Sequence, residues 1–225
     1  GGGKSDALLM AALQYADVPG YSALLLRRSY TDLSLPGALM DRAKAWLMPS
    51  VARWRDSLKT WEFPSGASIT FGYLEKPGDE YRYQSTEFQF VGFDELTQFT
   101  EVQYRYLFSR LRRPTGVDVP LRMRSASNPG GPGHEWVRER FIDAQGSVDS
   151  RIFIPASLPD NPYLDQAAYL ESLNQLDPVT RQQLLEGDWS ARQPGNLFRR
   201  EWFGVVDELP VMRNRSIRYW DLAAT

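Results

Sequence analysis

The first five residues carry a motif that could bind phosphate. Gly1-Gly2-Gly3-Lys4-Ser5 matches the last part of G-x-x-x-x-G-K-[ST], and the residues after it have helical spacing. In such a loop, backbone N–H groups surround the phosphates, the lysine neutralises the β/γ charge and the hydroxyl binds Mg²⁺. A flexible glycine-rich linker would have the same composition, so the motif alone leaves both interpretations open.

A pair of acidic residues follows an apolar run further along the chain. Phe88–Phe93 has the length of a buried strand and ends on Asp94-Glu95. An aspartate there could hold hydrated Mg²⁺ while the glutamate polarises an attacking water. The alternative is an ordinary acidic pair at a strand end or helix cap. Together with Lys4 and Ser5, the pair favours a nucleoside triphosphatase.

Asn128 and Arg82 are two weaker candidates for roles in nucleotide hydrolysis. Ser127-Asn128-Pro129 ends the next apolar strand, where an asparagine amide could sense the γ-phosphate, or could simply form an Asn-Pro turn. Arg82 lies between two tyrosines before the acidic strand and is a candidate arginine finger.

Other arginines and the single histidine have less specific patterns. Six arginines are grouped with one acid, Asp118, and could contact a phosphate backbone, supply a finger or form a solvated helix face; they are Arg105, Arg110, Arg112, Arg113, Arg122 and Arg124. We expect His134 to be a packing residue or a helix start rather than a catalyst.

The composition excludes several classes of protein. With 42% hydrophobic and 24% charged residues, the 225-residue chain is neither disordered nor fibrous. Its net charge of −2 creates no general attraction to nucleic acid or membrane, so any DNA contact must be local. The absence of cysteine excludes thiolate metal sites, and one histidine excludes a multi-histidine zinc centre. No apolar run approaches the roughly 18 residues of a membrane span.

Helical and strand patterns alternate along the chain, which predicts a parallel α/β sheet. We expect helices at 6–16, 36–48, 100–111 and 134–141, strands at 21–26, 88–93, 121–126 and 151–154, and a hairpin formed by 61–63 and 68–73. Two short helices should follow Asp160. The second has Asp177 as cap, Pro178 in its first turn and Gly187 past its end.

These motifs, in this order, resemble the large terminase subunit of tailed bacteriophages. The stretches that carry the resemblance are Leu26–Leu33, Phe63–Gly66, Tyr83–Phe88, Val91–Phe99, Ser127–Trp136, Leu158–Leu164 and Gly187–Trp189. In that family an ATPase domain precedes a nuclease of ribonuclease-H type.

The resemblance implies a P-loop NTPase of the α/β class, with a mainly parallel central sheet flanked by helices. The expected parts are an N-terminally truncated ATPase core at 1–156, a small helical lid at 157–190, a linker at 191–215 and the first nuclease strand at 216–225. Asp221 on that strand would be the first metal-binding carboxylate of a two-metal nuclease, or else a plain strand-end aspartate.

The resemblance also implies a set of roles. The backbone of Gly1, Gly2, Gly3, Lys4 and Ser5 and the Lys4 side chain would hold ATP, Ser5 and Asp94 would hold Mg²⁺, Glu95 would activate water, and Asn128 would couple hydrolysis to movement. The motor would drive double-stranded DNA into a procapsid, and the nuclease would cut it.

The implied partners are a small terminase subunit, the portal protein and further copies of the chain in a ring, with no membrane. The protein would work in the host cytoplasm and, transiently, at the procapsid portal.

Two alternative functions remain from the sequence. Another P-loop DNA motor, such as a helicase-like or segregation ATPase, would lack a nuclease carboxylate at Asp221. A non-catalytic nucleotide-binding scaffold would not need the complete set of Lys4, Ser5, Asp94 and Glu95.

Overall fold

The computed structural model describes residues 3–144, 151–156, 158–161, 163 and 165–191. The chain divides into two units, Gly1–Ala191 and Arg192–Thr225, and the second lies outside the described residues. The predictions for Gly1, Gly2, the linker at 192–215 and the nuclease strand with Asp221 therefore fall outside the described part.

A six-stranded mixed sheet forms the centre of the first unit, in the order β2-β3-β4-β1-β5-β6. The strands are β1 (Ser22–Arg27), β2 (Arg53–Arg55), β3 (Thr60–Glu62), β4 (Ser68–Tyr73), β5 (Phe90–Asp94) and β6 (Arg122–Ala126). β4, β1, β5 and β6 are parallel, whereas β2 and β3 add an antiparallel edge. The predicted α/β class and mainly parallel sheet are confirmed, and the hairpin pairs as expected.

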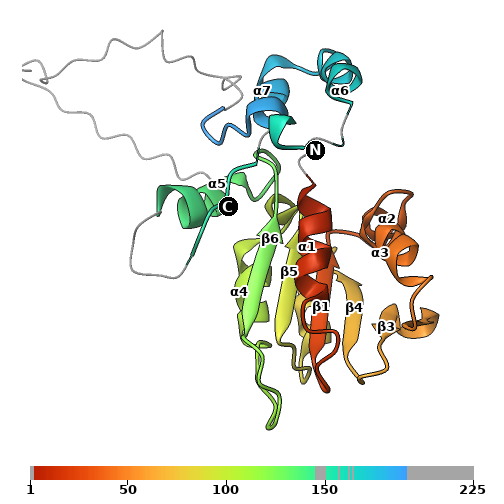
Figure 1. Cartoon of the computed structure of the whole chain (residues 1–225). Coiled ribbons are helices and arrows are strands. Elements are labelled where there is room, and N and C mark those ends of the chain that lie inside the picture. Colours follow the sequence, from red (N-terminus) through yellow and green to blue (C-terminus); the bar gives the residue numbers. More distant parts are fainter. Residues whose placement is uncertain (1–2, 145–150, 157, 162, 164, 192–225) are drawn as a thin grey trace, which may run out of the picture. The chain divides into compact units, whose positions relative to one another are not determined.

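Helices cover both faces of this sheet (Figure 1). They are α1 (Lys4–Leu13), α2 (Tyr30–Ser34), α3 (Leu39–Leu47), α4 (Glu101–Phe108), α5 (His134–Arg138), α6 (Gln166–Leu173) and α7 (Pro178–Glu186). Short 3-10 turns lie at Asp56–Leu58, Asp79–Tyr83, Leu96–Gln98 and Leu158–Asp160, and a π turn at Glu139–Asp143 extends α5. Within the described residues, no helix has the length and apolar character to cross a membrane.

The central strand β1 explains why the core has two halves. Its side chains alternate between the two faces, as in any strand. Leu25 belongs to the cluster that also contains Leu9 of α1 and Met40 of α3. Leu24 belongs to the opposite cluster, with Leu107 of α4. The middle of β1, Ala23–Leu26, is therefore apolar because both faces of the strand are buried there.

Three elements differ from the sequence prediction. The helix expected at 36–48 is present as α3, but the short helix α2 before it, which Ser29 caps and which Gly37 with φ of 75° separates from α3, was not predicted. The short strand β2 was not predicted. The strand expected at 151–154 is wrong: residues 151–156 form neither helix nor strand, and Phe153 packs beside Trp189 instead.

Candidate active site

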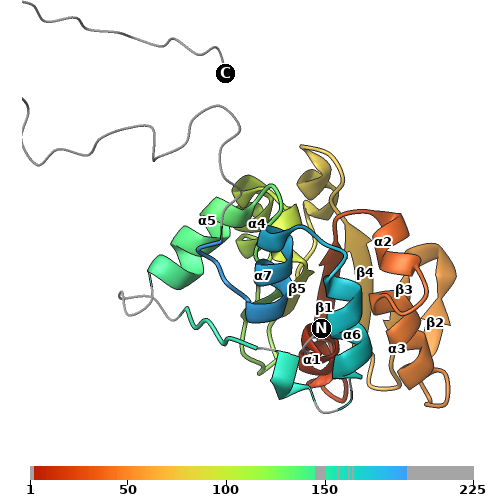
Figure 2. The same cartoon turned by 90° about the horizontal axis from the view of Figure 1, so that it is seen from above.

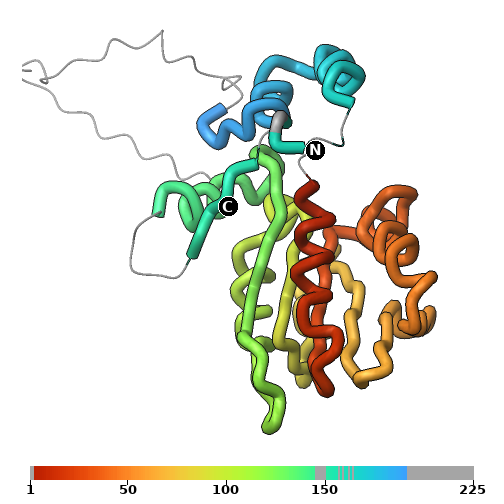
Figure 3. The backbone as a smooth tube through the Cα atoms, in the orientation of Figure 1, coloured from red at the N-terminus to blue at the C-terminus, as the bar shows by residue number. Residues whose placement is uncertain are grey.

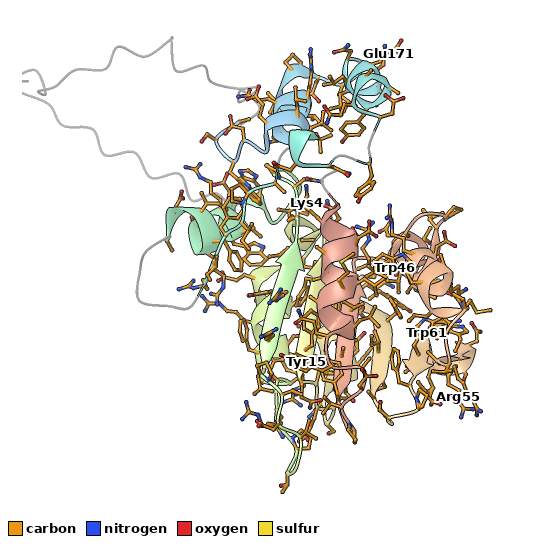
Figure 4. All side chains as sticks on the ribbon, in the orientation of Figure 1. Lys4, Tyr15, Trp46, Arg55, Trp61 and Glu171 are labelled. Atoms are coloured by element: carbon orange, nitrogen blue, oxygen red, sulfur yellow. The ribbon has the colours of Figure 1, made fainter. Side chains whose placement is uncertain are left out.

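The carboxyl ends of β1, β5 and β6 meet at the edge of the sheet where α1 begins. This follows from the parallel pairing of the three strands and from the position of α1, which lies along them (Figure 3). Lys4 lies in the first turn of α1, at this edge (Figure 4). Gly3 precedes the helix with φ of 69°, a left-handed conformation that favours glycine. Ligands of parallel α/β sheets commonly bind at such an edge.

Ser5 and Asp94 are in contact there, although they are 89 positions apart in the sequence. The Ser5 hydroxyl donates a hydrogen bond of 2.9 Å to Oδ1 of Asp94. Ser5 belongs to the first turn of α1, and Asp94 is the last residue of β5, with only 2% of its side chain exposed. The end of the phosphate-loop motif and the acidic pair therefore form one site, as their chemistry predicts.

Arg27 places a positive charge beside the two carboxylates of this site. Its Nε lies 3.4 Å from Oδ2 of Asp94, and its Nη1 lies 3.9 Å from Oε1 of Glu95. The register pairs Leu26 of β1 with Phe93 of β5, so Arg27 comes beside Asp94. The sequence analysis missed Arg27. Its position at the end of an apolar strand was the one available signal, but that signal does not reveal which strand is the neighbour.

Both carboxylic acids have raised pKa values. Burial is the main cause for Asp94, opposed by the positive charge of Arg27 and the hydrogen bond from Ser5. Burial also raises the pKa of Glu95, and the neighbouring charge of Asp94 adds to it, against Arg27, Lys4 and the backbone of Asn128. The site thus holds two acids in a poorly hydrated place, which is the usual environment of a catalytic carboxylate.

Glu95 stands in a left-handed backbone conformation, with φ of 56°. Such a conformation is uncommon for a residue with a side chain and is often found at functional positions. It marks the turn from β5 into the 3-10 turn Leu96–Gln98.

A hydrogen-bonded network joins this turn to the end of β6. The hydroxyl of Ser127 donates to Oγ1 of Thr97 at 3.2 Å, and the Thr97 hydroxyl donates to the carbonyl oxygen of Asn128 at 3.3 Å. The backbone N–H of Thr97 also donates to the Ser127 hydroxyl. Asn128 is therefore connected to the segment that carries Glu95.

Two neighbouring clefts share Asn128 and Pro129. One, of about 230 Å³, is lined on the sheet side by Glu95 and Thr97 and on the other side by Thr180 and Gln183 of α7. The other, of about 80 Å³, includes Lys4 and Trp189 in its lining. Seen from above, α6 and α7 lie over the end of the molecule where α1 begins (Figure 2). A helix from the later part of the chain thus forms a wall beside Glu95.

The oxygen donors of Ser5 and Asp94 suit Mg²⁺, a hard cation that prefers oxygen ligands. Among the described residues, no three acidic or histidine side chains gather as a complete metal site. Mg²⁺ bound to nucleotide needs no such cage, because it takes one or two protein ligands, phosphate oxygens and waters. The residues present therefore fit this ion.

Arg82 lies in a different setting from the candidates above. Its Nη2 forms an ion pair of 2.9 Å with Oδ1 of Asp79, and its guanidinium lies 5.0 Å from the ring centre of Tyr73. Half of its side chain is exposed. The contacts of Arg82 are thus with Asp79 and Tyr73, and its role as a finger stays a prediction.

His134 is a packing residue, as expected. It is buried, its Nδ1 accepts a hydrogen bond from the backbone of Gly130, and its ring stacks on Trp189 at 5.3 Å.

Three of the six grouped arginines have separate partners within the protein. Arg105 pairs with Glu101, Arg112 with Glu87, and Arg122 bonds Gln14 of the chain.

Comparison with known proteins decides the family. A family model described as "Terminase large subunit, T4likevirus-type, N-terminal" matches residues 1–205. The chain belongs to the large terminase subunit family. A search of curated proteins found no match.

Solved large terminases share the fold. The large terminase of the thermophilic bacteriophage D6E matches with a TM-score of 0.62 and 15% identity, over 83% of this chain and 44% of that one. Its complex with ATP-gamma-S matches with a TM-score of 0.62 and 14% identity, over 84% and 45%. The bacteriophage HK97 large terminase matches with a TM-score of 0.55 and 14% identity, over 83% and 44%. This terminase chain therefore spans less than half the length of those proteins.

Proposed function

We propose that this terminase chain binds and hydrolyses ATP with Mg²⁺, and that hydrolysis drives the movement of double-stranded DNA into a procapsid. The observation that carries the proposal is the hydrogen bond between Ser5 and Asp94, with Glu95 beside it. It joins the hydroxyl of a phosphate-loop motif to the acid pair that such enzymes need. The solved D6E terminase in complex with ATP-gamma-S has the same fold, which supports a nucleotide as the ligand.

Each residue of the site has a role in this proposal. Lys4 neutralises charge on the β and γ phosphates, and backbone N–H groups at the start of α1 bind phosphate oxygens, with help from the helix dipole. Glu95 orients a water and accepts its proton on a carboxylate oxygen as the water attacks the γ-phosphorus, while the bond from that phosphorus to the β–γ bridging oxygen breaks and ADP leaves. Asn128 is linked through Thr97 to the segment of Glu95 and relays the loss of the γ-phosphate to its own loop.

Ser5 and Asp94 would hold Mg²⁺, which neutralises the charge of the phosphate oxygens when it is bound. Without it, Asp94 is held by the Ser5 hydroxyl and by the charge of Arg27. The protein thus keeps a buried carboxylate in place before the substrate arrives.

The partners and location of the proposed motor follow from its family. We propose a ring of copies at the portal protein of the procapsid, supplied with DNA by a small terminase subunit, in the host cytoplasm. Arg82 is half exposed, so it could act as a finger toward the nucleotide of a neighbouring subunit. Cutting of the DNA would belong to a nuclease that begins near Asp221.

Two substitutions in the full-length large subunit test the ATPase function. Lys4→Ala should weaken the binding of ATP, since it removes a positive charge from the phosphate site. Glu95→Gln should leave ATP bound but lower kcat by about 10²–10⁴-fold, because it removes the base. Nucleotide titration and a phosphate-release assay measure the two effects. Unchanged binding in Lys4→Ala, together with unchanged turnover in Glu95→Gln, would contradict the proposal and favour a scaffold.

A further inference from the structure

We propose that Arg27 is a positioning residue that holds the Glu95 carboxylate in its catalytic orientation. This role rests on the proposed ATPase function and adds a residue to it. Two different nitrogens of the Arg27 guanidinium face two carboxylates, Nε toward Asp94 and Nη1 toward Glu95. A guanidinium can serve both because its donors have fixed and different directions.

The two carboxylates depend on Arg27 to different degrees. Asp94 is also held by the Ser5 hydroxyl and has almost no exposed surface. Glu95 is more exposed, at 35% of its side chain, and within the described residues its one ion pair is with Arg27. Loss of Arg27 should therefore free Glu95 more than Asp94.

The environment of Arg27 supports a role at this site rather than in general packing. Its Nε is buried and, among the described residues, makes no hydrogen bond. The nearest carboxylate oxygen, Oδ2 of Asp94, lies 3.4 Å from it, so this nitrogen faces Asp94 as a buried positive charge and does not complete a hydrogen bond. The charge of Arg27 thus faces both acids.

The neighbouring Arg28 provides an internal contrast. Its Nη1 donates to the carbonyl oxygen of Leu74 and to Oε1 of Gln103, away from the acid pair. Arg28 is the first residue after β1, and its contacts place its guanidinium away from the two carboxylates that Arg27 faces. Arg28 is therefore a control of the same residue type at nearly the same place.

The test is a double-mutant cycle between Arg27 and Glu95 in the full-length large subunit. Arg27→Gln should lower kcat by about 10–100-fold, because a misplaced catalytic group loses rate steeply. The Kd for ATP-gamma-S with Mg²⁺, measured by titration, should change by less than about threefold, since Lys4 and Ser5 remain. Arg27→Lys should recover part of the lost rate.

The cycle shows whether Arg27 acts through Glu95. In a Glu95→Gln background, Arg27→Gln should cause little further loss of kcat, because the group that it positions is already gone. Arg28→Gln should have the same effect on kcat in both backgrounds. If Arg27→Gln does not fold, as judged by thermal unfolding, the same double-mutant cycle is measured with Arg27→Lys in place of Arg27→Gln.

Two results would overturn the inference. One is a parental kcat in the Arg27 variant. The other is an equal loss of rate with and without Glu95, which would mean that Arg27 acts independently of it. Failure of the proposed function looks different, because the Glu95→Gln protein itself would then hydrolyse ATP at the parental rate.

Discussion

Glu95, the proposed catalytic base, has a strained backbone conformation and a carboxyl group with a raised pKa. Its φ of 56° is a left-handed conformation that costs roughly 1–2 kcal/mol for a residue with a Cβ atom. Its carboxyl group is also near the buried Asp94, and both burial and that charge raise its pKa. A residue chosen for stability alone would be a glycine here. The structure thus keeps a strained acid where the chemistry needs one.

Replacement of Glu95 by glycine should therefore separate stability from activity. We expect Glu95→Gly to raise the free energy of unfolding by about 1 kcal/mol and to abolish hydrolysis. Glu95→Gln is the matched control, since it loses the base but keeps the strained backbone. Urea unfolding of both variants measures the difference. Equal stability of the two variants would show that the backbone at this position is not strained.

The loops after β5 and β6 are joined to each other by hydrogen bonds. Thr97 lies at the centre, where it accepts from Ser127 and donates to the carbonyl oxygen of Asn128. Thr97 is 2% exposed, so water cannot easily replace these bonds. In the proposed mechanism, these bonds would connect the turn that carries Glu95 to Asn128.

Thr97→Val should weaken this connection with little change in shape. We expect a loss of about 1–3 kcal/mol in the free energy of unfolding, because the hydrogen bonds of the Thr97 hydroxyl with Ser127 and with the carbonyl oxygen of Asn128 are both lost. DNA-stimulated hydrolysis should fall more than basal hydrolysis. Thr70→Val is a suitable control, since it removes a hydroxyl paired with Thr60 on the far side of the sheet. If both variants lowered stimulated hydrolysis alike, the network would have no special part in coupling.

The strand β4 depends on a glycine for its contact with the turn at Asp79–Tyr83. A Cβ atom at Gly72 would lie 1.9 Å from Oη of Tyr83 and 3.2 Å from Leu26. Tyr83 is partly buried against the core, with its ring 6.4 Å from that of Phe88, and burial raises the pKa of its hydroxyl to about 12. The ring therefore has little freedom to move away.

Gly72→Ala should destabilise the protein by about 1–3 kcal/mol through overpacking. A second change, Tyr83→Phe, removes the hydroxyl that clashes and should recover part of the loss. Thermal unfolding of the single and double variants measures this. A double variant no more stable than Gly72→Ala alone would place the strain elsewhere.

At the scale of the whole protein, the chain covers less than half of the solved terminases that it matches. Asp221 lies outside the described residues, so its nuclease role is a prediction from the sequence. The proposed ATPase site would use Lys4, Ser5, Asp94 and Glu95, and the proposed nuclease would share none of these ligands. The two activities should therefore be separable by mutation.

Asp221→Ala in the full-length subunit should abolish Mg²⁺- or Mn²⁺-dependent DNA cleavage and leave ATP hydrolysis intact. The reason is that a lost carboxylate disrupts a two-metal centre. A plasmid-nicking assay run beside an ATPase assay measures both activities. Full cleavage by this variant would remove the nuclease role of Asp221 and favour a motor without that domain.

The sequence by itself indicated the residues of the candidate site and most of the elements. Lys4, Ser5, Asp94 and Glu95 could be found because local motifs and apolar runs encode helices, strands and the residues at their ends. The same rule found the helix that begins after Thr100 and the caps of α7 at Asp177 and Gly187. It failed at 151–154, where the short apolar run Ile152–Ile154 forms no strand and leaves both isoleucines exposed, while Phe153 packs beside Trp189.

The tertiary structure alone decided which of these residues meet. The order of the sheet places β1 between β4 and β5, so neighbours in space are distant in sequence. That order brings Arg27 to Asp94 and Glu95. Local patterns are set by backbone geometry within a few residues, whereas strand order is set by the burial of the whole core. For that reason, the charge partner of the acid pair could be recognised only in the folded protein.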